Sequence, residues 1–216
     1  MIRKPIVGVM GGGAPDAATY EQAREVGRLI AAGGALLLCG GCGGVMEAAA
    51  RGAREGGGRS IGILPYAPGE GAANRFVDCA VFTGLGDGRN YVNACTSDVL
   101  IALRGGAGTL SEIALALKIG VPVVFLDAWD FLAAQPPLSA TPTASARSPR
   151  EAVAAAFKLA RFTPGGPFAA PFAYPALPDQ AAAREQLRRF LVEDAERPAA
   201  AAPAPLPPPG RRDGRC

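Results

Sequence analysis

A glycine-rich stretch followed by an acid is the part of this sequence best suited to chemistry. It comes after the apolar residues 99–103, and its candidate ligand-binding residues are Gly105, Gly106, Ala107, Gly108 and Thr109. Glycines between a strand and a helix leave backbone N–H groups uncovered, and such groups at the start of a helix bind phosphate and other anions. Shortly after this stretch, Glu112 supplies a carboxylate that is a candidate catalytic or ligand-orienting acid.

The same residues also fit a purely structural explanation. Thr109 and Glu112 have the spacing of a capping box, in which the Glu side chain closes the start of a helix. Two features favour a binding site instead. The stretch has more glycines than a tight turn requires, and Arg89 begins an upstream helical segment next to Asn90. A guanidinium can hold a phosphate or a carboxylate through two parallel hydrogen bonds, so Arg89 is the second candidate catalytic residue and Asn90 a candidate ligand-binding residue.

Two more clusters of glycine follow apolar segments near the start of the chain. The candidate ligand-binding residues in them are Gly11 and Gly12 after the first segment, and Gly40, Gly41, Gly43 and Gly44 after the second. Such glycines either permit a strand to pack closely against a helix or form backbone walls around a ligand. The second interpretation is favoured, because the carboxyl ends of parallel strands share one edge, where several loops converge on one ligand.

Short apolar runs alternate with helical patterns along this part of the chain. Strands are expected at residues 6–10, 35–39, 60–64, 79–82, 99–103 and 121–126, and helices at 17–32, 45–55, 89–96 and 109–119. A Ser-Pro-x-Glu pattern that starts at Ser148 predicts a further helix ending near residue 162. Apolar strands separated by helices are typical of a parallel sheet covered on both faces. The pattern predicts an α/β fold: a Rossmann-like, doubly wound, mainly parallel sheet of about six strands with helices on both faces.

The composition changes near residue 133, because most of the 29 glycines precede it and most of the 20 prolines follow it. One domain is expected over residues 1–162, with a low-complexity loop at 133–147 inside it. Residues 163–216 read as a Pro/Ala-rich tail that is compatible with a charged helix at 179–196 and is disordered at its end.

Charge, hydropathy and cysteine content indicate which partners and which cellular location to expect. The net charge is only +3 and no basic run lies within residues 1–132, so no nucleic acid polymer is expected as a partner. No stretch reaches the roughly 18 apolar residues that a membrane span requires, so no membrane partner is expected either. The five cysteines are an odd number in a chain large enough to fold without disulfides, and a cytoplasmic location is expected.

The chain contains no histidine, so any chemistry has to rest on carboxylates and arginines. Ser-His-Asp and Cys-His machinery of the usual kind is therefore excluded. Cys39 and Cys42 lack the further ligands of a tetrahedral zinc site, and Cys39 is interpreted as a buried strand residue rather than a redox group. No metal is expected, and no cofactor is required for chemistry.

The motifs, taken in order, resemble those of a known superfamily. Residues 105–112 have the spacing Gly-Gly-x-Gly-Thr-x-x-Glu, with the glycine cluster of 40–46 upstream and Arg89 between them. This arrangement is similar to the LONELY GUY (LOG) superfamily, sometimes labelled lysine decarboxylase-like, over roughly residues 4–127. For the enzymatic branch the resemblance implies hydrolysis of the N-glycosidic bond of AMP or a cytokinin riboside monophosphate, with Glu112 and Arg89 catalytic and the glycines on the phosphate. It does not imply a lysine decarboxylase.

The sequence departs from that enzymatic branch at several positions. Arg104 stands where the branch has Pro, Glu47 where it has Gly, and Asn90 where it has Lys. The residues at 44–49, 83–86 and 108–113 look more like the branch that includes molybdenum cofactor carrier proteins. In that branch the same crevice binds a phosphorylated pterin, and no hydrolysis is implied.

Two main functions remain open on this basis. The first is carrier-like binding of a phosphorylated small ligand, a nucleotide or a molybdopterin-type cofactor as cargo, at the glycine-rich loops. The alternative is a phosphoribohydrolase that cleaves nucleoside 5′-monophosphates to the base and ribose 5-phosphate. A third possibility is an interaction module that uses the tail. A homo-oligomer, either a dimer or a dimer of dimers, is expected as in the superfamily, because an Ala/Leu/Ile-rich helix at 109–119 can bury more than one face.

Overall fold

The computed structural model describes residues 4–128 and 139–161. All the candidate site residues predicted from the sequence lie within these ranges. The predicted tail at 163–216, with its helix at 179–196, lies outside the described residues.

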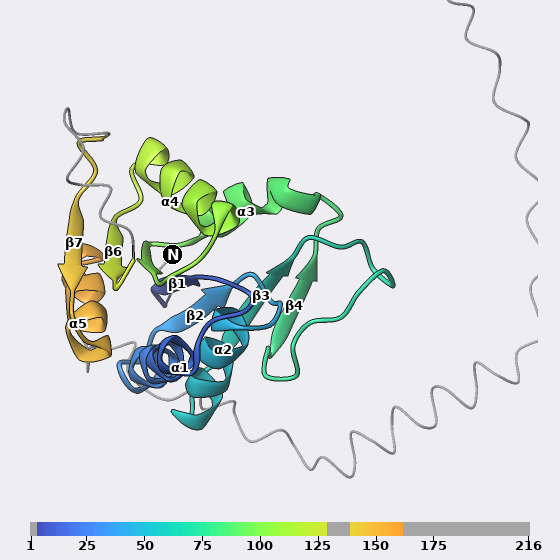
Figure 1. Cartoon of the computed structure of the whole chain (residues 1–216), viewed down its shortest axis with the longest axis horizontal. Coiled ribbons are helices and arrows are strands. Elements are labelled where there is room, and N and C mark those ends of the chain that lie inside the picture. Colours follow the sequence, from blue (N-terminus) through green and yellow to red (C-terminus); the bar gives the residue numbers. More distant parts are fainter. Residues whose placement is uncertain (1–3, 129–138, 162–216) are drawn as a thin grey trace, which may run out of the picture. The chain divides into compact units, whose positions relative to one another are not determined.

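The centre of the fold is one sheet of seven strands in which all neighbouring strands are parallel. In chain order the strands are β1 (Ile6–Met10), β2 (Leu36–Cys39), β3 (Ser60–Leu64), β4 (Cys79–Phe82), β5 (Val99–Ala102), β6 (Val123–Leu126) and β7 (Thr143–Ala146). Their order across the sheet is β4-β3-β2-β1-β5-β6-β7. The chain therefore builds one half outward from β1 and then returns to β5 to build the other half (Figure 1).

Helices cover both faces of the sheet (Figure 1). On one face lie α1 (Ala17–Ala32), α2 (Val45–Glu55) and α5 (Pro149–Leu159); on the other lie α3 (Arg89–Thr96), preceded by the short 3₁₀ helix η1 (Gly86–Gly88), and α4 (Ala107–Ile119). Alternate residues of β5 enter the two cores, since Val99 and Ile101 pack with the first group of helices. Leu100 and Ala102 pack with the second group. Burial on both faces explains why the central strands are apolar at every position.

The predicted Rossmann-like α/β fold is confirmed, with one strand more than expected. β7 lies within the segment 133–147 that the sequence predicted as a low-complexity loop. It pairs in parallel with β6, from Thr143 opposite Val123 to Ala146 opposite Leu126. β7 is at the edge of the sheet and only its Ala146 is buried. An edge strand of this kind does not need the apolar run by which the central strands were recognised.

The helix predicted to start at Ser148 is confirmed as α5. The Ser148 side chain accepts a hydrogen bond from the backbone N–H of Glu151 at 3.3 Å, and the Glu151 carboxylate accepts one from the N–H of Arg147 at 2.9 Å. Pro149 is the first helical residue, where the missing N–H costs no intrahelical bond.

Helices α1 and α2 pack closely because each has a glycine at the contact. A Cβ added to Gly27 would collide with the carbonyl oxygen of Ala49, and one added to Gly52 would collide with that of Arg24. Both obstacles are backbone atoms, which cannot rotate away as the end of a side chain can. The helix crossing therefore requires glycine at both positions.

Replacing Gly52 by Ala is expected to lower the free energy of unfolding by about 3 kcal/mol, because the two helices must separate to admit the methyl group. Gly88→Ala is the matched control, since Gly88 has φ −59° and ψ −21° and its Cβ would meet only the Leu85 Cβ at 3.7 Å. Urea denaturation followed by circular dichroism measures both variants. Equal losses in the two would contradict this account of the crossing.

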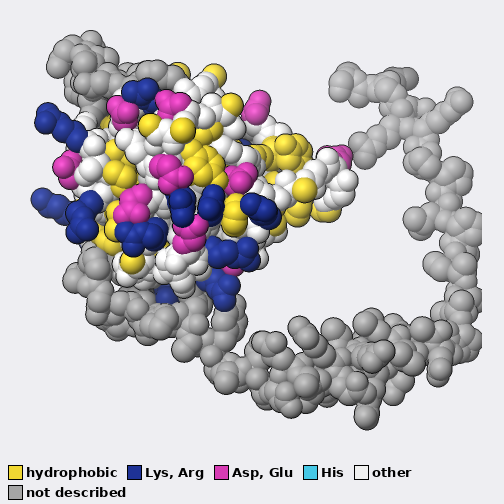
Figure 2. Space-filling model, turned by 60° about the horizontal axis from the view of Figure 1, so that its bottom comes forward, with side chains coloured by type: hydrophobic (Ala, Val, Ile, Leu, Met, Phe, Trp, Pro, Cys, Tyr) yellow, Lys and Arg dark blue, Asp and Glu magenta, His cyan; other side chains and the backbone are white. Residues whose placement is uncertain are grey.

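The face turned forward in Figure 2 carries cationic and anionic side chains that are interleaved. On α1 and α2 such residues form exposed ion pairs, Arg24 and Arg51 with Glu55 and Arg28 with Glu25. Exposed pairs contribute little to stability and are typical of a solvated surface. Within the described ranges, no helix is both long enough and apolar enough to cross a bilayer.

Candidate functional site

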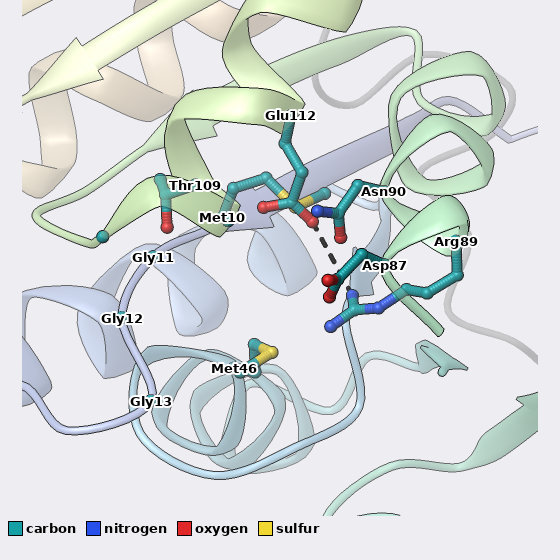
Figure 3. Close-up of a pocket in the computed structure, with 12 residues that line it drawn as sticks. Met10, Gly11, Gly12, Gly13, Met46, Asp87, Arg89, Asn90, Thr109 and Glu112 are labelled. Carbon is teal, nitrogen blue, oxygen red and sulfur yellow. Dashed lines mark ion pairs between the residues drawn. The ribbon is translucent and has the colours of Figure 1, made fainter. Parts of the chain in front are cut away.

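A pocket of about 290 Å³ lies at the carboxyl edge of the sheet, where β1 ends and α4 begins. Its walls come from β1 and the loop after it, the first turn of α2, the η1–α3 segment and the start of α4 (Figure 3). The lining residues are Met10, Gly11, Gly12, Gly13, Met46, Asp87, Arg89, Asn90, Gly106, Gly108, Thr109 and Glu112. β1 and β5 are the strands between which the order of the sheet reverses, and doubly wound sheets bind their ligands at this point.

The start of α4 forms one wall of the pocket. Gly106 is the N-cap residue, and no side chain caps the first N–H groups of the helix. Gly105 is tightly enclosed, because a Cβ there would collide with the Thr109 side chain and lie 3.0 Å from the nitrogen of Gly12. The helix start therefore presents backbone donors and the positive end of the helix dipole to the pocket, which suits an anion.

Three lining glycines keep the space in front of this wall open. A Cβ at Gly13, Gly106 or Gly108 would meet no protein atom within 4 Å. At Gly11, by contrast, a Cβ would lie 2.6 Å from the Val45 Cγ1 atom. The glycines of the pocket thus serve two purposes: some leave room for ligand atoms, and others allow segments of the protein to pack closely.

The backbone of Gly12 connects two neighbouring elements. Its N–H donates to the carbonyl oxygen of Arg104 at 2.9 Å, and its own carbonyl oxygen accepts from the N–H of Val45 at 3.0 Å. Gly44, the N-cap of α2, has φ 67°, and a Cβ there would lie 2.5 Å from the Gly12 oxygen. This close approach ties the loop after β1 to the end of β5 and to the start of α2.

The two candidate catalytic residues lie together in the pocket. The Glu112 Oε1 atom is 3.6 Å from the Arg89 Nη1 atom, and the two side chains are only 8% and 12% exposed (Figure 3). Asn93 donates a hydrogen bond from its Nδ2 to the same Oε1 atom at 2.7 Å. Arg89 and Asn93 belong to α3 and Glu112 to α4, so the packing of these two helices creates the acid–guanidinium pair.

The capping-box explanation of Thr109 and Glu112 is wrong. Helix α4 begins at Ala107, two residues before the predicted start, and its N-cap is Gly106. Glu112 therefore lies beyond the first turn, and its carboxylate is turned towards Asn93 rather than back towards the helix start. The glycines allow the chain to enter the helix earlier than the capping pattern suggests.

Burial raises the pKa of Glu112, while the Asn93 hydrogen bond and the Arg89 charge act in the opposite direction. The Arg89 Nη1 atom is buried and has no hydrogen-bond partner among the described residues. Its 3.6 Å distance from Glu112 permits an ion pair but is too long for a hydrogen bond. Gly40 makes room for the guanidinium, because a Cβ there would collide with it. The site thus holds a buried cationic donor with unused capacity next to an acid of raised pKa.

Asn90 is held at the edge of the pocket by a short chain of hydrogen bonds. Its Nδ2 donates to the Ser111 Oγ at 2.8 Å, and Ser111 Oγ donates to the carbonyl oxygen of Gly108 at 2.7 Å. This arrangement leaves the Asn90 carbonyl oxygen as an acceptor next to the pocket.

The structure brings eight of the predicted site residues to the pocket and places six outside its lining. Those that line it are Gly11, Gly12, Arg89, Asn90, Gly106, Gly108, Thr109 and Glu112. The others, which support the walls or lie behind them, are Gly40, Gly41, Gly43, Gly44, Gly105 and Ala107. The second glycine cluster, predicted as a wall of the crevice, thus contributes mainly by seating Arg89 and by capping α2.

Five residues of the site were not predicted from the sequence: Met10, Gly13, Met46, Asp87 and Asn93. Met10 and Gly13 flank two predicted glycines, so their position next to that loop was a usable signal. Asn93 lies one helical turn after Arg89, a spacing that puts both side chains on one face of a helix. Met46 lies within residues 44–49, which carry the family resemblance, but the motif did not mark it as a pocket residue, and for Asp87 the sequence offers no comparable signal.

The cysteine pair plays no part in the pocket lining. Cys39 is fully buried, and burial raises its pKa to about 12, so the thiol stays protonated and unreactive. Among the described residues there is no group of three or more His, Cys, Asp or Glu side chains that could hold a metal ion.

Comparison with known proteins gives a match to a family model. Residues 4–153 match the model of the SLOG cluster4 family. An uncharacterized protein of Archaeoglobus fulgidus is 47% identical over 120 residues, which cover 56% of this chain and 78% of that protein.

Two solved structures of similar fold are of proteins described as binding or carrying the molybdenum cofactor. The molybdenum cofactor binding protein of Rippkaea orientalis is 43% identical with a TM-score of 0.66, and the match covers 72% of this chain and 96% of that one. The molybdenum cofactor carrier protein of Chlamydomonas reinhardtii is 40% identical, also with a TM-score of 0.66, over 73% of this chain and 98% of that one. The resemblance found in the sequence motifs is thereby confirmed.

Proposed function

The chain belongs to the SLOG cluster4 family, and from this membership we propose that it binds a phosphorylated small molecule in the pocket and carries it unchanged. The observation that carries the proposal is the Arg89 side chain, which lines the pocket and whose buried Nη1 atom has no hydrogen-bond partner among the described residues. A buried donor without a partner costs free energy, and an anionic ligand would remove this cost.

The helix start supports placing the phosphate at α4. Gly106 and Gly108 leave its first backbone donors uncovered, and Thr109 adds a hydroxyl at the same end. Backbone donors at a helix N-terminus bind phosphate without a second cation. Arg89 then holds a further polar or anionic group of the ligand, which competes with the Glu112 carboxylate for the guanidinium.

A molybdopterin-type cofactor is the cargo that the relatives favour. Two of them are described as a molybdenum cofactor binding protein and a molybdenum cofactor carrier protein, and the match covers nearly the whole length of each. Such a molecule combines a phosphate with a pterin, whose aminopyrimidinone ring is flat. A pocket with a phosphate end and polar side chains beyond it suits both parts.

Calorimetric titration with molybdopterin and with nucleoside monophosphates tests the proposal. Gly108→Ala supplies the sharpest variant, because its methyl group would enter the open space without meeting a protein atom. We expect an affinity at least about tenfold weaker with a melting temperature that is not lowered, because Ala favours the helix more than Gly does. If the intact folded protein binds none of these ligands, the proposal fails.

A phosphoribohydrolase is the second candidate, and the raised pKa of Glu112 favours it. In this reaction water adds to C1′ of the ribose as the C1′–N9 bond breaks, and the departing base takes a proton. A carboxyl group of raised pKa next to a guanidinium is suited to such proton transfer. Incubation with AMP, followed by chromatography for free adenine, tests this candidate. Activity that persists unchanged in Glu112→Gln would remove Glu112 from the mechanism.

The proposal includes self-association through α3 and α4. Leu110 and Ile119 on α4 are 37% and 36% exposed, and Tyr91 on α3 is 50% exposed. Large apolar side chains on one helical layer are typical of a contact between copies. Light scattering at micromolar concentration is expected to give at least a dimer, and Leu110→Glu is expected to shift the protein towards monomer. A monomeric wild-type protein would contradict this.

A further inference from the structure

The two ends of the pocket differ in chemical character. Gly11, Gly12 and Thr109 lie at one end, where backbone donors predominate (Figure 3). Asp87 and Arg89, from η1 and α3, lie at the other end in the same view. A ligand with one phosphate therefore meets backbone donors at one end of the pocket and charged side chains at the other.

The Asp87 carboxylate cannot contribute favourably to the binding of a phosphate. It would repel a phosphate placed next to it, yet Asp87 lines the pocket, and in Figure 3 the side chain of this exposed residue points into the pocket. A carboxylate is an acceptor without donors of its own. It is therefore matched to a part of the ligand that carries N–H groups, and that part must be turned away from the phosphate end.

Methionine supplies all of the large apolar side chains in the pocket lining. Of the 12 lining residues, five are glycine and five are polar, and the remaining two are Met10 and Met46. Met10 is only 1% exposed, whereas Met46 rises from α2 on the opposite side of the pocket from Thr109 and Glu112 (Figure 3). A thioether is polarisable and adapts its shape, and it contacts the face or edge of a flat ring favourably.

These observations extend the proposed function and rest on it. We infer that the pocket selects a phosphorylated ligand whose planar ring lies against Met46 and presents two adjacent N–H groups to Asp87. An aminopyrimidinone edge, as in guanine or a pterin, has such a pair of donors, and a carboxylate accepts both in parallel. The corresponding edge of adenine pairs one donor with one acceptor. Asp87 is thus the residue that distinguishes the two ring classes.

Calorimetry on the full chain with GMP, AMP and ribose 5-phosphate tests this inference, because the three probes share the same sugar phosphate. We expect GMP to bind about tenfold more tightly than AMP, which corresponds to one charge-assisted pair of hydrogen bonds. Ribose 5-phosphate, which lacks a ring, is expected to bind most weakly. Equal affinities for GMP and AMP would overturn the inference.

Two variants separate the contributions of the ring edge and the ring face. Asp87→Asn is expected to bring the GMP-to-AMP affinity ratio close to one. Met46→Ala is expected to weaken both nucleotides by about fivefold and to leave ribose 5-phosphate unchanged. Asp127→Asn is the matched control, since Asp127 is exposed, pairs with Arg104 and does not line the pocket. Its affinity ratio is expected to equal that of the wild type.

The outcomes distinguish this inference from the proposed function. If all three probes bind but the ratio is the same in Asp87→Asn and in the wild type, the assignment of Asp87 fails and phosphate binding stands. If Met46→Ala weakens ribose 5-phosphate as much as the nucleotides, Met46 supports the whole pocket rather than the ring. If none of the probes binds to the folded protein, both the inference and the proposed function fail.

Discussion

Replacing Arg89 by Ala is expected to weaken the binding of nucleoside monophosphates by about a hundredfold, within the range measured when one partner of a buried charge pair is removed. Arg89 is the one cationic residue in the described pocket lining, and its guanidinium packs over Gly40, with an Nη1 atom that is ion-paired to Glu112 but has no hydrogen-bond partner among the described residues. Without it, the ligand meets Asp87 and Glu112 with no opposing charge. Calorimetric titration with GMP and AMP measures the loss.

The control for Arg89 is Arg104, which follows β5 but does not line the pocket. Its side chain is 61% exposed and pairs with Asp127 at 3.0 Å. Arg104→Ala is expected to change the affinity by less than about threefold, as removal of an exposed pair does. Arg89→Lys keeps the charge but cannot reproduce the planar fork, so an intermediate loss is expected. Equal losses in Arg104→Ala and Arg89→Ala would refute a specific role for Arg89.

Glu112→Gln is expected to strengthen phosphate-ligand binding by about tenfold at neutral pH, because it removes a negative charge that competes with the ligand for Arg89. The same substitution would abolish activity in a phosphoribohydrolase that uses Glu112 for proton transfer. The Glu112→Gln variant therefore distinguishes a carrier protein from a phosphoribohydrolase. Titration with a nucleotide and chromatography for the free base provide the two measurements.

The raised pKa of Glu112 also predicts how this effect depends on pH. The carboxyl is neutral below its folded pKa, so wild type and Glu112→Gln are expected to bind alike there, and the two diverge as the pH rises through that value. The ionisation of the phosphate affects wild type and Glu112→Gln equally, so it does not change the ratio of their affinities. A ratio that stays constant with pH would show that Glu112 does not compete with the ligand.

Stability is expected to follow the same ionisation. Because the folded pKa is raised above the ordinary value of 4.5, the unfolded chain releases the Glu112 proton at lower pH than the folded chain does. The contribution of this group is fully favourable below the ordinary value and is lost as the pH rises through the folded pKa. Glu112→Gln has no carboxyl group at this position, so it does not lose stability in this way as the pH rises. Urea denaturation of both proteins over this range measures the difference, and parallel pH profiles would contradict the prediction.

The site residues that could be predicted from the sequence are those that belong to a short motif of neighbouring residues. The glycines of 105–108 stand between an apolar strand and a helix, and the juxtaposition of Arg89 and Glu112 followed from the family motif. Asp87 and Met46 could not be found in this way, because an Asp between two glycines and a Met early in a helix have many possible roles. Only the packing of α2 and α3 around the end of β1 brings them to one pocket.

The errors also have physical causes. Glu112 matched the spacing of a capping box, but the conformation of Gly106 set the start of α4 two residues earlier and turned the acid towards α3. β7 escaped the hydropathy pattern because an edge strand buries little of its surface. In both places the tertiary arrangement outweighed a local signal.

The two hydrogen bonds of the Gly12 backbone have a consequence for the speed of ligand capture. Because the Gly12 backbone is hydrogen-bonded to Arg104 on one side and to Val45 on the other, the loop after β1 that lines the pocket has little freedom to rearrange. A cavity preorganised in this way pays little ordering entropy on association. A carrier of this design would take up its cargo by simple encounter, and the lifetime of the complex, rather than a slow closing motion, would determine how readily the cargo is handed on.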